Sequence, residues 1–305
     1  MDGERGWWAR LLAADGIGPS MARRLVAALG SAHAVCTAGA GRLQQSTGLA
    51  YADATRLIQS IRAVDIDREQ HWLSQHSGRL IPFGHSEYPS TLVQIPDAPG
   101  VLRVQGVLPS AEQPIVAIVG TRRCSPYGLR QAGRFTRGLV EAGCCIVSGG
   151  ARGIDAEVHR MALRCGGSTV VVLGSGLARR YPPEHDELFD RIVDSGGALV
   201  SEVGVHHPPR PWLFPRRNRI VSGLALGVLV IEAPERSGAM ITARLAVEDH
   251  GRDAMVVPGP ADSITHSGGH RAIQQGWAHL VMSPDEAVAV LLQDQEGFRR
   301  FFMPQ

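Results

Sequence analysis

A glycine-rich segment with one arginine runs from Ser148 to Asp155 and has the residue types of an anion-binding loop. Glycine lets the backbone turn tightly and approach a ligand closely, and the segment holds three, Gly149, Gly150 and Gly153. A helix that starts after the loop would direct free N–H groups and the positive end of its dipole toward a bound group. Arg152 adds a full charge. We expect the loop to bind phosphate, with Ser148 and Asp155 in the site. The alternative is that its glycines serve only helix–sheet packing.

Two further segments concentrate arginine. Gly120-Thr121-Arg122-Arg123 follows an apolar run, and one of its arginines could reach a phosphate held by the glycine loop. The densest cationic run is 214–220, whose predicted site residues are Phe214, Arg216, Arg217, Asn218 and Arg219. This run is expected to open a helix, where positive charge opposes the helix dipole, so a bound anion is favoured there. The alternatives are a solvated surface pair for the first segment and a solvated charged turn for the second.

The segment 235–242 leaves two interpretations open. Ser237 precedes a predicted helix and could be its N-cap. It could equally offer its hydroxyl and backbone N–H to a phosphate, with Gly238 and Thr242 in the same site.

Catalytic and metal-binding patterns are few. Asp155 and His159 stand four residues apart and could form an acid–base pair, although a cap with a local hydrogen bond is the commoner origin of this spacing. The sequence has no G-x-S-x-G, no G-x-x-x-x-G-K-[ST] and no metal-ligand spacing. Its five cysteines form no C-x-x-C pair and are expected to be reduced core thiols. We therefore expect no catalytic residue, no metal and no cofactor.

Positive charge concentrates in the middle of the chain. The net charge is only +2, but residues 122–219 hold fifteen basic and nine acidic side chains, whereas residues 220–305 hold six and ten. The chain has no lysine. Genomic base composition is the simplest reason for the absence of lysine, and the arginine guanidinium suits phosphate either way.

No apolar run reaches the roughly 18–20 residues of a membrane helix. The N-terminus lacks the pattern of a secretory signal, so we expect a cytoplasmic protein.

The elements that must position these residues alternate in type. After residue 114, short apolar runs alternate with helical patterns, which predicts a doubly wound, mostly parallel α/β sheet covered on both faces. Ligands of such folds bind beyond the carboxyl ends of the strands, where the glycine and arginine segments stand. The predicted strands are 115–119, 144–147, 169–173, 198–201, 227–231, 254–257 and 279–282, and the helices are expected near 127–142, 154–166, 184–195, 216–224, 238–250, 268–276 and 284–292.

The first part of the chain has a different pattern. Residues 1–63 are predicted to form a small all-helical domain, with helices at 7–14 and 19–29. The turn between them contains Gly16-Ile17-Gly18 and resembles a helix–hairpin–helix element, whose backbone amides can bind a DNA phosphate. An inert helical bundle is the alternative. Residues 64–113 are expected to be a connector with short strands at 80–83 and 101–104. The core domain is placed at 114–295 and a tail at 296–305.

Several ordered motifs together resemble the DprA/Smf family of DNA-processing proteins. They are Ala117-Ile118-Val119-Gly120-Thr121-Arg122, Ser125-Pro126-Tyr127-Gly128, Ser148-Gly149-Gly150-Ala151-Arg152-Gly153-Ile154-Asp155, Tyr181-Pro182-Pro183-Glu184, Phe214-Pro215-Arg216-Arg217-Asn218-Arg219-Ile220 and Arg236-Ser237-Gly238-Ala239-Met240-Ile241-Thr242-Ala243. The resemblance covers roughly residues 64–292.

The resemblance implies a helical domain of the SAM or helix–hairpin–helix type, followed by an extended Rossmann-like domain. That domain would form a homodimer and bind single-stranded DNA in a basic pocket. It also implies a recombination mediator that loads RecA onto incoming strands in natural transformation. The residues that map onto pocket motifs are Arg122, Arg152, Arg216 and Arg219, and the glycines of the loop would shape the floor.

This sequence departs from the family pattern at four places. Gly150 replaces a non-glycine residue, Arg123 replaces a common lysine, and Ser267-Gly268-Gly269-His270 replaces a stretch that usually carries asparagine. Many relatives end in a winged helix, which is not expected in a chain that stops at Gln305.

Two other functions remain open at this stage. A nucleotide-binding enzyme that resembles a nucleoside monophosphate phosphoribohydrolase would need a carboxylate beside the glycine loop, and Glu202 and Glu232 are the candidates at strand ends. The P-G-G-x-G-T signature of that class is missing. A pure interaction scaffold with vestigial loops is the third hypothesis, and the positive middle segment argues against it.

Overall fold

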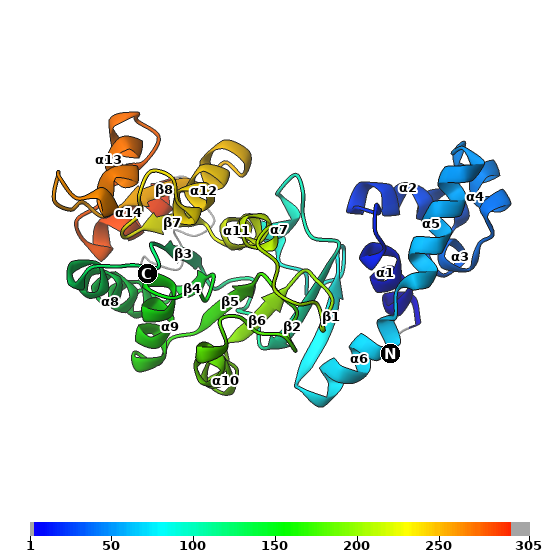
Figure 1. The fold of residues 1–305 in the computed structure, drawn as a ribbon, viewed down its shortest axis with the longest axis horizontal. Helices are drawn as coiled ribbons and strands as arrows, with labels where there is room; N and C mark the ends of the chain where they lie inside the picture. Colours follow the sequence, from blue (N-terminus) through cyan, green and yellow to red (C-terminus); the bar gives the residue numbers. More distant parts are fainter. Residues whose placement is uncertain (1–2, 294–305) are drawn as a thin grey trace, which may run out of the picture.

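The computed structural model describes residues 3–293 of the chain. A helical unit lies at one end of the molecule and a sheet flanked by helices makes up the rest (Figure 1). The predicted tail at 296–305 lies outside the described residues. No helix in the described part of the chain is long and apolar enough to cross a membrane.

The helical unit contains five helices, α1 (Gly3–Ala13), α2 (Pro19–Leu29), α3 (Ala32–Thr37), α4 (Ala40–Thr47) and α5 (Tyr51–Ala63). The second helix begins at a proline, which suits the first helical position because its missing N–H would have no intrahelical partner. It ends at Gly30, whose φ of +95° gives the left-handed cap that favours glycine. Apolar residues on the inner faces, among them Leu11, Leu25 and Leu43, are fully buried together. The predicted all-helical start of the chain is therefore confirmed.

A single nine-stranded sheet runs through the remainder in the order β1-β2-β6-β5-β4-β3-β7-β8-β9. All neighbours from β6 to β9 are parallel, as predicted, whereas β1 and β2 are antiparallel. The strands are β1 (Gly78–Pro82), β2 (Val101–Gly106), β3 (Ile115–Val119), β4 (Cys145–Ser148), β5 (Thr169–Leu173), β6 (Ala198–Ser201), β7 (Gly227–Val230), β8 (Asp253–Val256) and β9 (His279–Leu280). The seven predicted strands of the core are β3 to β9.

The segment 64–113, expected to be a connector, contributes more than that. It forms α6 (Ile66–Gln75) and α7 (Ser90–Val93), and its two predicted short strands are β1 and β2. Because β2 pairs with β6, the sheet extends directly into this segment. The sheet therefore begins about 35 residues earlier than the predicted start of the core at residue 114, since β1 starts at Gly78.

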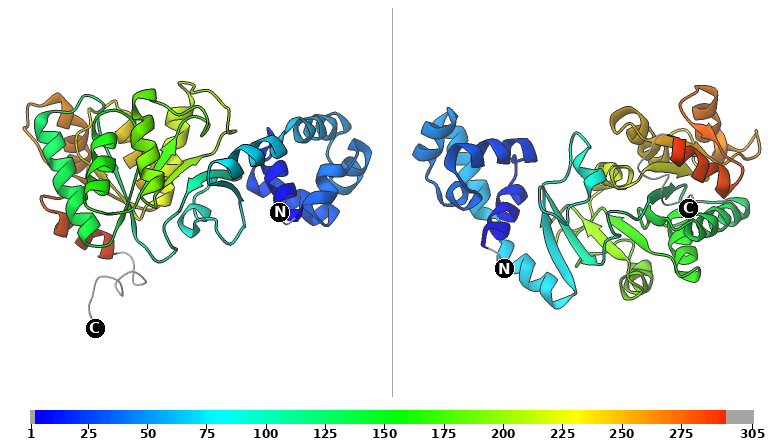
Figure 2. Two further views of the ribbon diagram at one scale, coloured as in Figure 1. Left: turned by 90° about the horizontal axis from the view of Figure 1, so that it is seen from below. Right: turned by 180° about the vertical axis from the view of Figure 1, so that it is seen from behind.

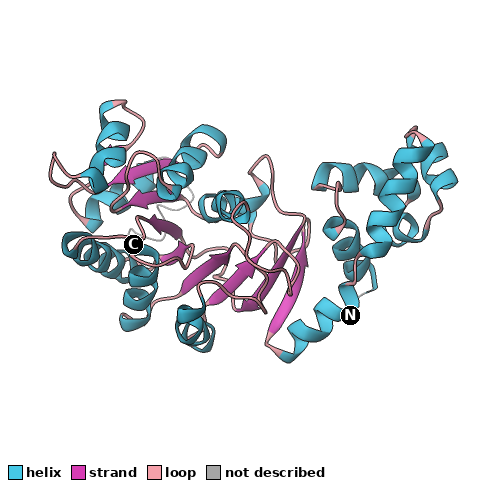
Figure 3. Ribbon diagram, viewed as in Figure 1, coloured by secondary structure: helices cyan, strands magenta, loops and turns pink. Residues whose placement is uncertain are grey.

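Helices cover both faces of the sheet (Figures 2 and 3). Side chains alternate along each strand, so Val116 and Ile118 of β3 pack under one layer of helices while Ala117 and Val119 pack under the other. The first layer holds α8 (Pro126–Glu141), α9 (Ile154–Arg164), α10 (Asp186–Asp194) and α14 (Pro284–Gln293). The second holds α7, α11 (Leu213–Leu224), α12 (Gly238–Arg244), continued by one π turn at Leu245–Asp249, and α13 (Ser267–Gln274).

The order of the strands determines where a ligand can bind. From the central strand β3 the chain builds β4, β5 and β6 on one side, and then returns to place β7 on the other side of β3. Loops leaving β3 and β7 thus diverge and open a crevice at the carboxyl ends of these strands, the usual ligand position in doubly wound folds.

Candidate nucleic-acid interface

A cleft of about 700 Å³ opens at this crevice. The loops after β3 and β4 form one wall, and the first turns of α11 and α12 form the other. Twelve of the eighteen predicted site residues line it: Gly120, Thr121, Arg122, Arg123, Gly149, Asp155, Phe214, Arg217, Asn218, Ser237, Gly238 and Thr242. The structure thus brings together segments that are up to 122 residues apart in the chain. Their binding of DNA stays a prediction.

Three exposed arginines stand at the cleft, Arg122, Arg123 and Arg236. None of the three takes part in an ion pair within the described residues 3–293. Arg236 was not among the predicted site residues, although it directly precedes Ser237 in a motif that the sequence singles out. The cleft therefore presents positive charge that no carboxylate of the described chain neutralises through a direct contact.

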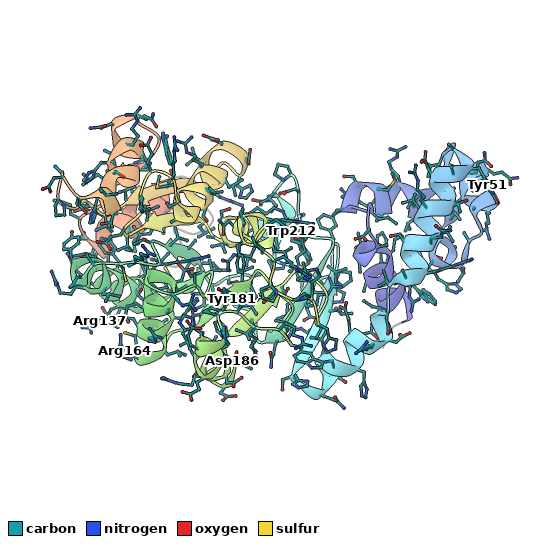
Figure 4. All side chains as sticks on the ribbon, viewed as in Figure 1. Tyr51, Arg137, Arg164, Tyr181, Asp186 and Trp212 are labelled. Carbon is teal, nitrogen blue, oxygen red and sulfur yellow. The ribbon has the colours of Figure 1, made fainter. Side chains whose placement is uncertain are left out.

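An aromatic surface accompanies these charges. The guanidinium carbon of Arg122 lies 5.8 Å from the centre of the Phe214 ring, within the range of a cation–π contact. The Phe214 ring in turn lies 5.5 Å from the ring of Tyr181, at a tilt of 55°. Tyr181 also lines the cleft, and Figure 4 shows it between the helices of the sheet domain. An aromatic face beside an arginine is the arrangement on which a nucleic-acid base can stack.

Arg217 forms the floor of the cleft and is buried. Its guanidinium donates hydrogen bonds to the carbonyl oxygen of Gly149, at 2.5 Å, and to that of Val172 at the end of β5. Burial lowers the pKa of Arg217 to about 10, an effect opposed by the nearby carboxylate of Asp155. The side chain is therefore still charged at neutral pH. The sequence predicted that Arg217 contacts phosphate. The structure shows that its guanidinium also ties the glycine loop to β5.

Gly149 leaves the space that this guanidinium occupies. A methyl group at this position would overlap the guanidinium of Arg217. Asp155, in the first turn of α9, is buried and accepts a hydrogen bond from the backbone N–H of Ala151, at 3.3 Å. Burial raises the pKa of Asp155, and the Arg217 charge works against that rise. The glycine loop is thus held from behind by a buried cation and a buried acid.

Three predicted residues of the loop support it without lining the cleft. Ser148 is buried and donates from its hydroxyl to the carbonyl oxygen of Ile118, at 2.7 Å. Gly153 has a φ of +79°, and a side chain there would overlap the carbonyl oxygen of Thr121. Gly150 has a φ of +67°. Both glycines adopt backbone conformations that other residues rarely adopt. At position 150 the family pattern has another residue, and glycine adopts the positive φ found here without strain.

Three predicted arginines lie outside the cleft. Arg152 is half exposed and forms an ion pair with Glu184, beside a small recess that Tyr181 also lines. Arg216 is half exposed and lies 3.3 Å from Glu202. Arg219 is buried, and its nitrogens lie 2.5 Å from Glu202 and 2.7 Å from Asp97. Arg219 is therefore a structural ion-pair residue and not an open cation of the cleft.

The geometry of α11 explains this division. The helix begins at Leu213, three residues before the predicted start, so all three arginines lie within its first two turns. Successive residues of a helix are rotated by about 100°. Arg216 and Arg219, three apart, share one side and face a second cleft of about 760 Å³, which the Gly16–Gly18 turn also lines. Arg217 alone points to the floor of the first cleft.

In the wall formed by α12, Ser237 has the predicted N-cap role, and its binding of phosphate stays a prediction. Its hydroxyl accepts a hydrogen bond from the backbone N–H of Met240, at 3.3 Å, so it is an N-cap that also lines the cleft. Asn218 and Thr242 each donate to the carbonyl oxygen of Gly238, at 3.1 Å. The Asn218 bond fixes the start of α12 against α11, whereas the Thr242 bond lies within α12.

The carboxylates considered for catalysis have other partners. Glu232 is buried and accepts from the backbone N–H and the hydroxyl of Ser125, at 2.9 and 2.5 Å, where it supports the start of α8. Glu202 pairs with arginines of the second cleft. His159 is buried, with Nδ1 2.7 Å from the hydroxyl oxygen of Thr169. Asp155 is the one carboxylate of the described chain that lines the first cleft.

Comparison with known proteins adds to this geometry. The model of the family "DNA recombination-mediator protein A" matches residues 79–292. Protein Smf of Escherichia coli (strain K12) is 43% identical over 79% of this chain, which spans 64% of that relative and so less than two thirds of its length. The DNA processing protein DprA of Streptococcus pneumoniae (strain ATCC BAA-255 / R6) is 42% identical over 66% of this chain and 70% of the relative.

Solved structures agree with the sequence comparison. The X-ray structure of DprA from Streptococcus pneumoniae superimposes with a TM-score of 0.79 at 31% identity, covering 93% of this chain and 97% of that one. DNA processing protein A from Helicobacter pylori, described for its single-stranded DNA binding mode, superimposes with a TM-score of 0.63 at 26% identity. That match covers 73% of this chain and 99% of the other.

Proposed function

The chain belongs to the DprA/Smf family of DNA-processing proteins, and from this premise we propose that it binds single-stranded DNA in the first cleft without sequence preference. One observation carries the proposal, namely the three exposed arginines Arg122, Arg123 and Arg236, which form no ion pair within residues 3–293 and stand at a cleft with a buried fourth cation. Phosphate neutralises such charges in any sequence. The Phe214 ring offers a stacking face, which suits unpaired bases.

We further propose that the protein acts as a mediator that loads RecA on incoming single strands in natural transformation, in the cytoplasm and without enzymatic activity of its own. The mediator role rests on the family. The absence of catalysis is supported by the position of Asp155, the single carboxylate of the cleft in residues 3–293, which is buried against Arg217. A nucleoside monophosphate hydrolase would need an acid directed at a ribosyl cation, and Glu202 and Glu232 have other partners.

A homodimer is part of the same proposal. Large apolar side chains are exposed toward the end of the described chain, namely Leu280 of β9 at 48%, Met282 at 59%, and Ile264, in the turn before α13, at 78%. Exposed apolar groups beside a free sheet edge are typical of subunit contacts. Light scattering of the wild type and of Ile264→Asp measures this directly, since only the wild type should have the mass of a dimer.

The DNA-binding proposal is tested by fluorescence anisotropy of labelled oligothymidine across a salt series, beside labelled duplex and labelled AMP. Single strands should bind best. Arg122→Gln and Arg236→Gln should each raise Kd about fivefold, as expected for an exposed ionic contact of about 1 kcal/mol. Each should also make the log–log salt slope shallower by about 0.7.

Arg191→Gln is the matched control, because Arg191 is an exposed arginine on α10 that does not line the cleft. If the oligonucleotide is ignored while AMP binds, the cleft is a small-nucleotide site and the proposal is wrong. If single strands do bind, RecA loading is the next test. It is measured as strand-exchange activity on DNA precoated with a single-strand binding protein, with and without this chain.

A further inference from the structure

A row of three arginines runs along the outer face of α8. Arg130, Arg134 and Arg137 are spaced four and three residues apart, which places them on one side of a helix. All three are exposed. The opposite side, with Ala132, Phe135 and Leu139, is fully buried against the sheet. We call these three arginines the α8 row.

No carboxylate neutralises the α8 row through an ion pair within the part of the chain that the structure describes. Arg130 lies over the ring of Tyr127 at 5.9 Å, and Arg134 lies 5.7 Å from the ring of Phe135. The single acid of α8 is Glu141, at its last residue. By contrast, the exposed Arg164 of the neighbouring α9 pairs with Glu157.

This arrangement is unfavourable for the helix itself. Like charges four residues apart, as in Arg130 and Arg134, destabilise a helix. No carboxylate of the described chain forms an ion pair with the row, so an external anion would relieve the repulsion. The chain carries only a small net positive charge, and therefore a local row without acids is not a consequence of overall composition.

The helix that carries the row starts close to the cleft. Arg123 lines the cleft and stands two residues before Ser125, the N-cap of α8. Glu232 fixes this junction by accepting from the backbone N–H and the hydroxyl of Ser125. From its start at Pro126 to Arg137 the helix rises about 16 Å at 1.5 Å per residue. Figure 4 shows Arg137 at the end of the molecule opposite the helical unit.

We propose that a DNA strand leaving the cleft continues along the α8 row, with its phosphates against Arg130, Arg134 and Arg137. The inference rests on the proposed function, because it extends the same strand. A length of about 16 Å corresponds to roughly five phosphates at the 3.4 Å spacing of a stacked strand. An acidic membrane is the less suitable partner, since a membrane-binding helix also needs an apolar surface, and Leu129, at 39%, is the one large apolar side chain of α8 that is well exposed.

The test compares oligothymidines of increasing length, from about four to about thirty nucleotides, a range that brackets known single-strand site sizes. The variant Arg130→Gln/Arg134→Gln/Arg137→Gln should bind the shortest oligomer like the wild type. It should bind the longest at least tenfold more weakly, with a salt slope shallower by about two units for three lost contacts. Glutamine keeps good helix propensity, and unchanged circular dichroism verifies the fold.

The matched control is Arg42→Gln/Arg62→Gln/Arg68→Gln, which removes from α4, α5 and α6 three exposed arginines that form no ion pair within residues 3–293. Replacing the α8 row by lysine should restore binding of the long oligomer. The inference is overturned if the control variant loses as much affinity for the longest oligomer as the α8 variant does. It is also overturned if the affinities of the α8 variant and the wild type depend on oligomer length in the same way. A third outcome that overturns it is that the α8 substitutions weaken binding to vesicles of acidic lipid but leave the affinity for long oligomers unchanged. Failure of the wild type to bind any oligomer would instead overturn the proposed function.

Discussion

Loss of stability in mild acid is expected to trace to one buried histidine beneath the glycine loop. His159 is fully buried, with Nδ1 2.7 Å from the Thr169 hydroxyl oxygen. That hydroxyl donates to the Ile146 carbonyl oxygen, at 2.8 Å, so it accepts from the Nδ1–H of the histidine. The other ring nitrogen, Nε2, is buried without a hydrogen-bond partner. Burial, assisted by the nearby His185 and Arg217 side chains, lowers the pKa of His159 from 6.5 to about 3.

The direction and the size of the effect follow from proton linkage. Between these two pKa values the unfolded chain binds a proton at this position and the folded chain does not, so stability is lost as pH falls. Each pH unit in this range is worth about 1.4 kcal/mol. Lowering the pH from 6.5 to 5.0 should therefore cost about 2 kcal/mol through His159 alone, a large part of the 5–15 kcal/mol that stabilises an ordinary domain.

The assay is urea unfolding of the wild type and of His159→Gln at pH 7.5 and pH 5.0. Glutamine can donate to the same hydroxyl but does not titrate. The wild type should lose about 2 kcal/mol more than the variant between the two pH values, while the other histidines contribute equally to both. His71→Gln, an exposed histidine of α6, should behave like the wild type. Parallel losses in wild type and His159→Gln would show that the buried imidazole accepts a proton in the folded state, and would refute the reasoning.

Three further predictions concern the cleft. Gly149→Ala should lower the free energy of unfolding by about 2–3 kcal/mol, because its methyl group displaces the Arg217 guanidinium from its backbone acceptors; thermal unfolding measures this, and an unchanged melting temperature would contradict it. Glu184→Gln should free Arg152 from its ion pair beside the cleft and tighten oligothymidine binding a few-fold, with a salt slope steeper by about 0.7; equal or weaker binding in the anisotropy assay would show that Arg152 does not reach the strand. Phe214→Leu should weaken binding of single strands about fivefold through the loss of one stacking face of about 1 kcal/mol, while an equal loss for duplex would argue against stacking.

The sequence predicts the sheet and the position of the cleft because both depend on patterns that are local in the chain. A continuous apolar run such as Ile115–Val119 indicates a strand buried on both faces. Parallel strands all end at the same edge, so the residues that follow β3 and β4 had to lie near each other. Recognising the strands and placing their ends at one edge does not require knowing which distant residues contact each other. Arg122 and Gly149 line the same cleft, as this reasoning predicts.

Side-chain direction and long-range pairing could not be predicted in this way. The arginine run at 214–220 indicates charge, but the sides of α11 on which Arg216 and Arg219 lie depend on the start of that helix at Leu213. Their partner Glu202 belongs to a loop after β6, and no local spacing links it to them. The antiparallel strand β1 was predicted as a strand, but its membership of the sheet depends on pairing with β2 across 19 or more residues.

The charges of the cleft differ in kind, and this difference bears on its function. Arg217 is buried, donates to two carbonyl oxygens and has Asp155 beside it, so its charge is held in one place by the fold. The exposed Arg122 has no carboxylate partner in the described chain, and its charge acts to lower the pKa of Arg217, the signature of repulsion between the two. Placing like charges together costs energy in the free protein, and an anion that enters the cleft recovers this energy. A catalytic site would instead direct an acid or a nucleophile at its substrate. Within residues 3–293, the exposed charged groups of the cleft are cations without an ion-pair partner and its one acid is buried behind them, which supports the proposal that the cleft holds a phosphate chain.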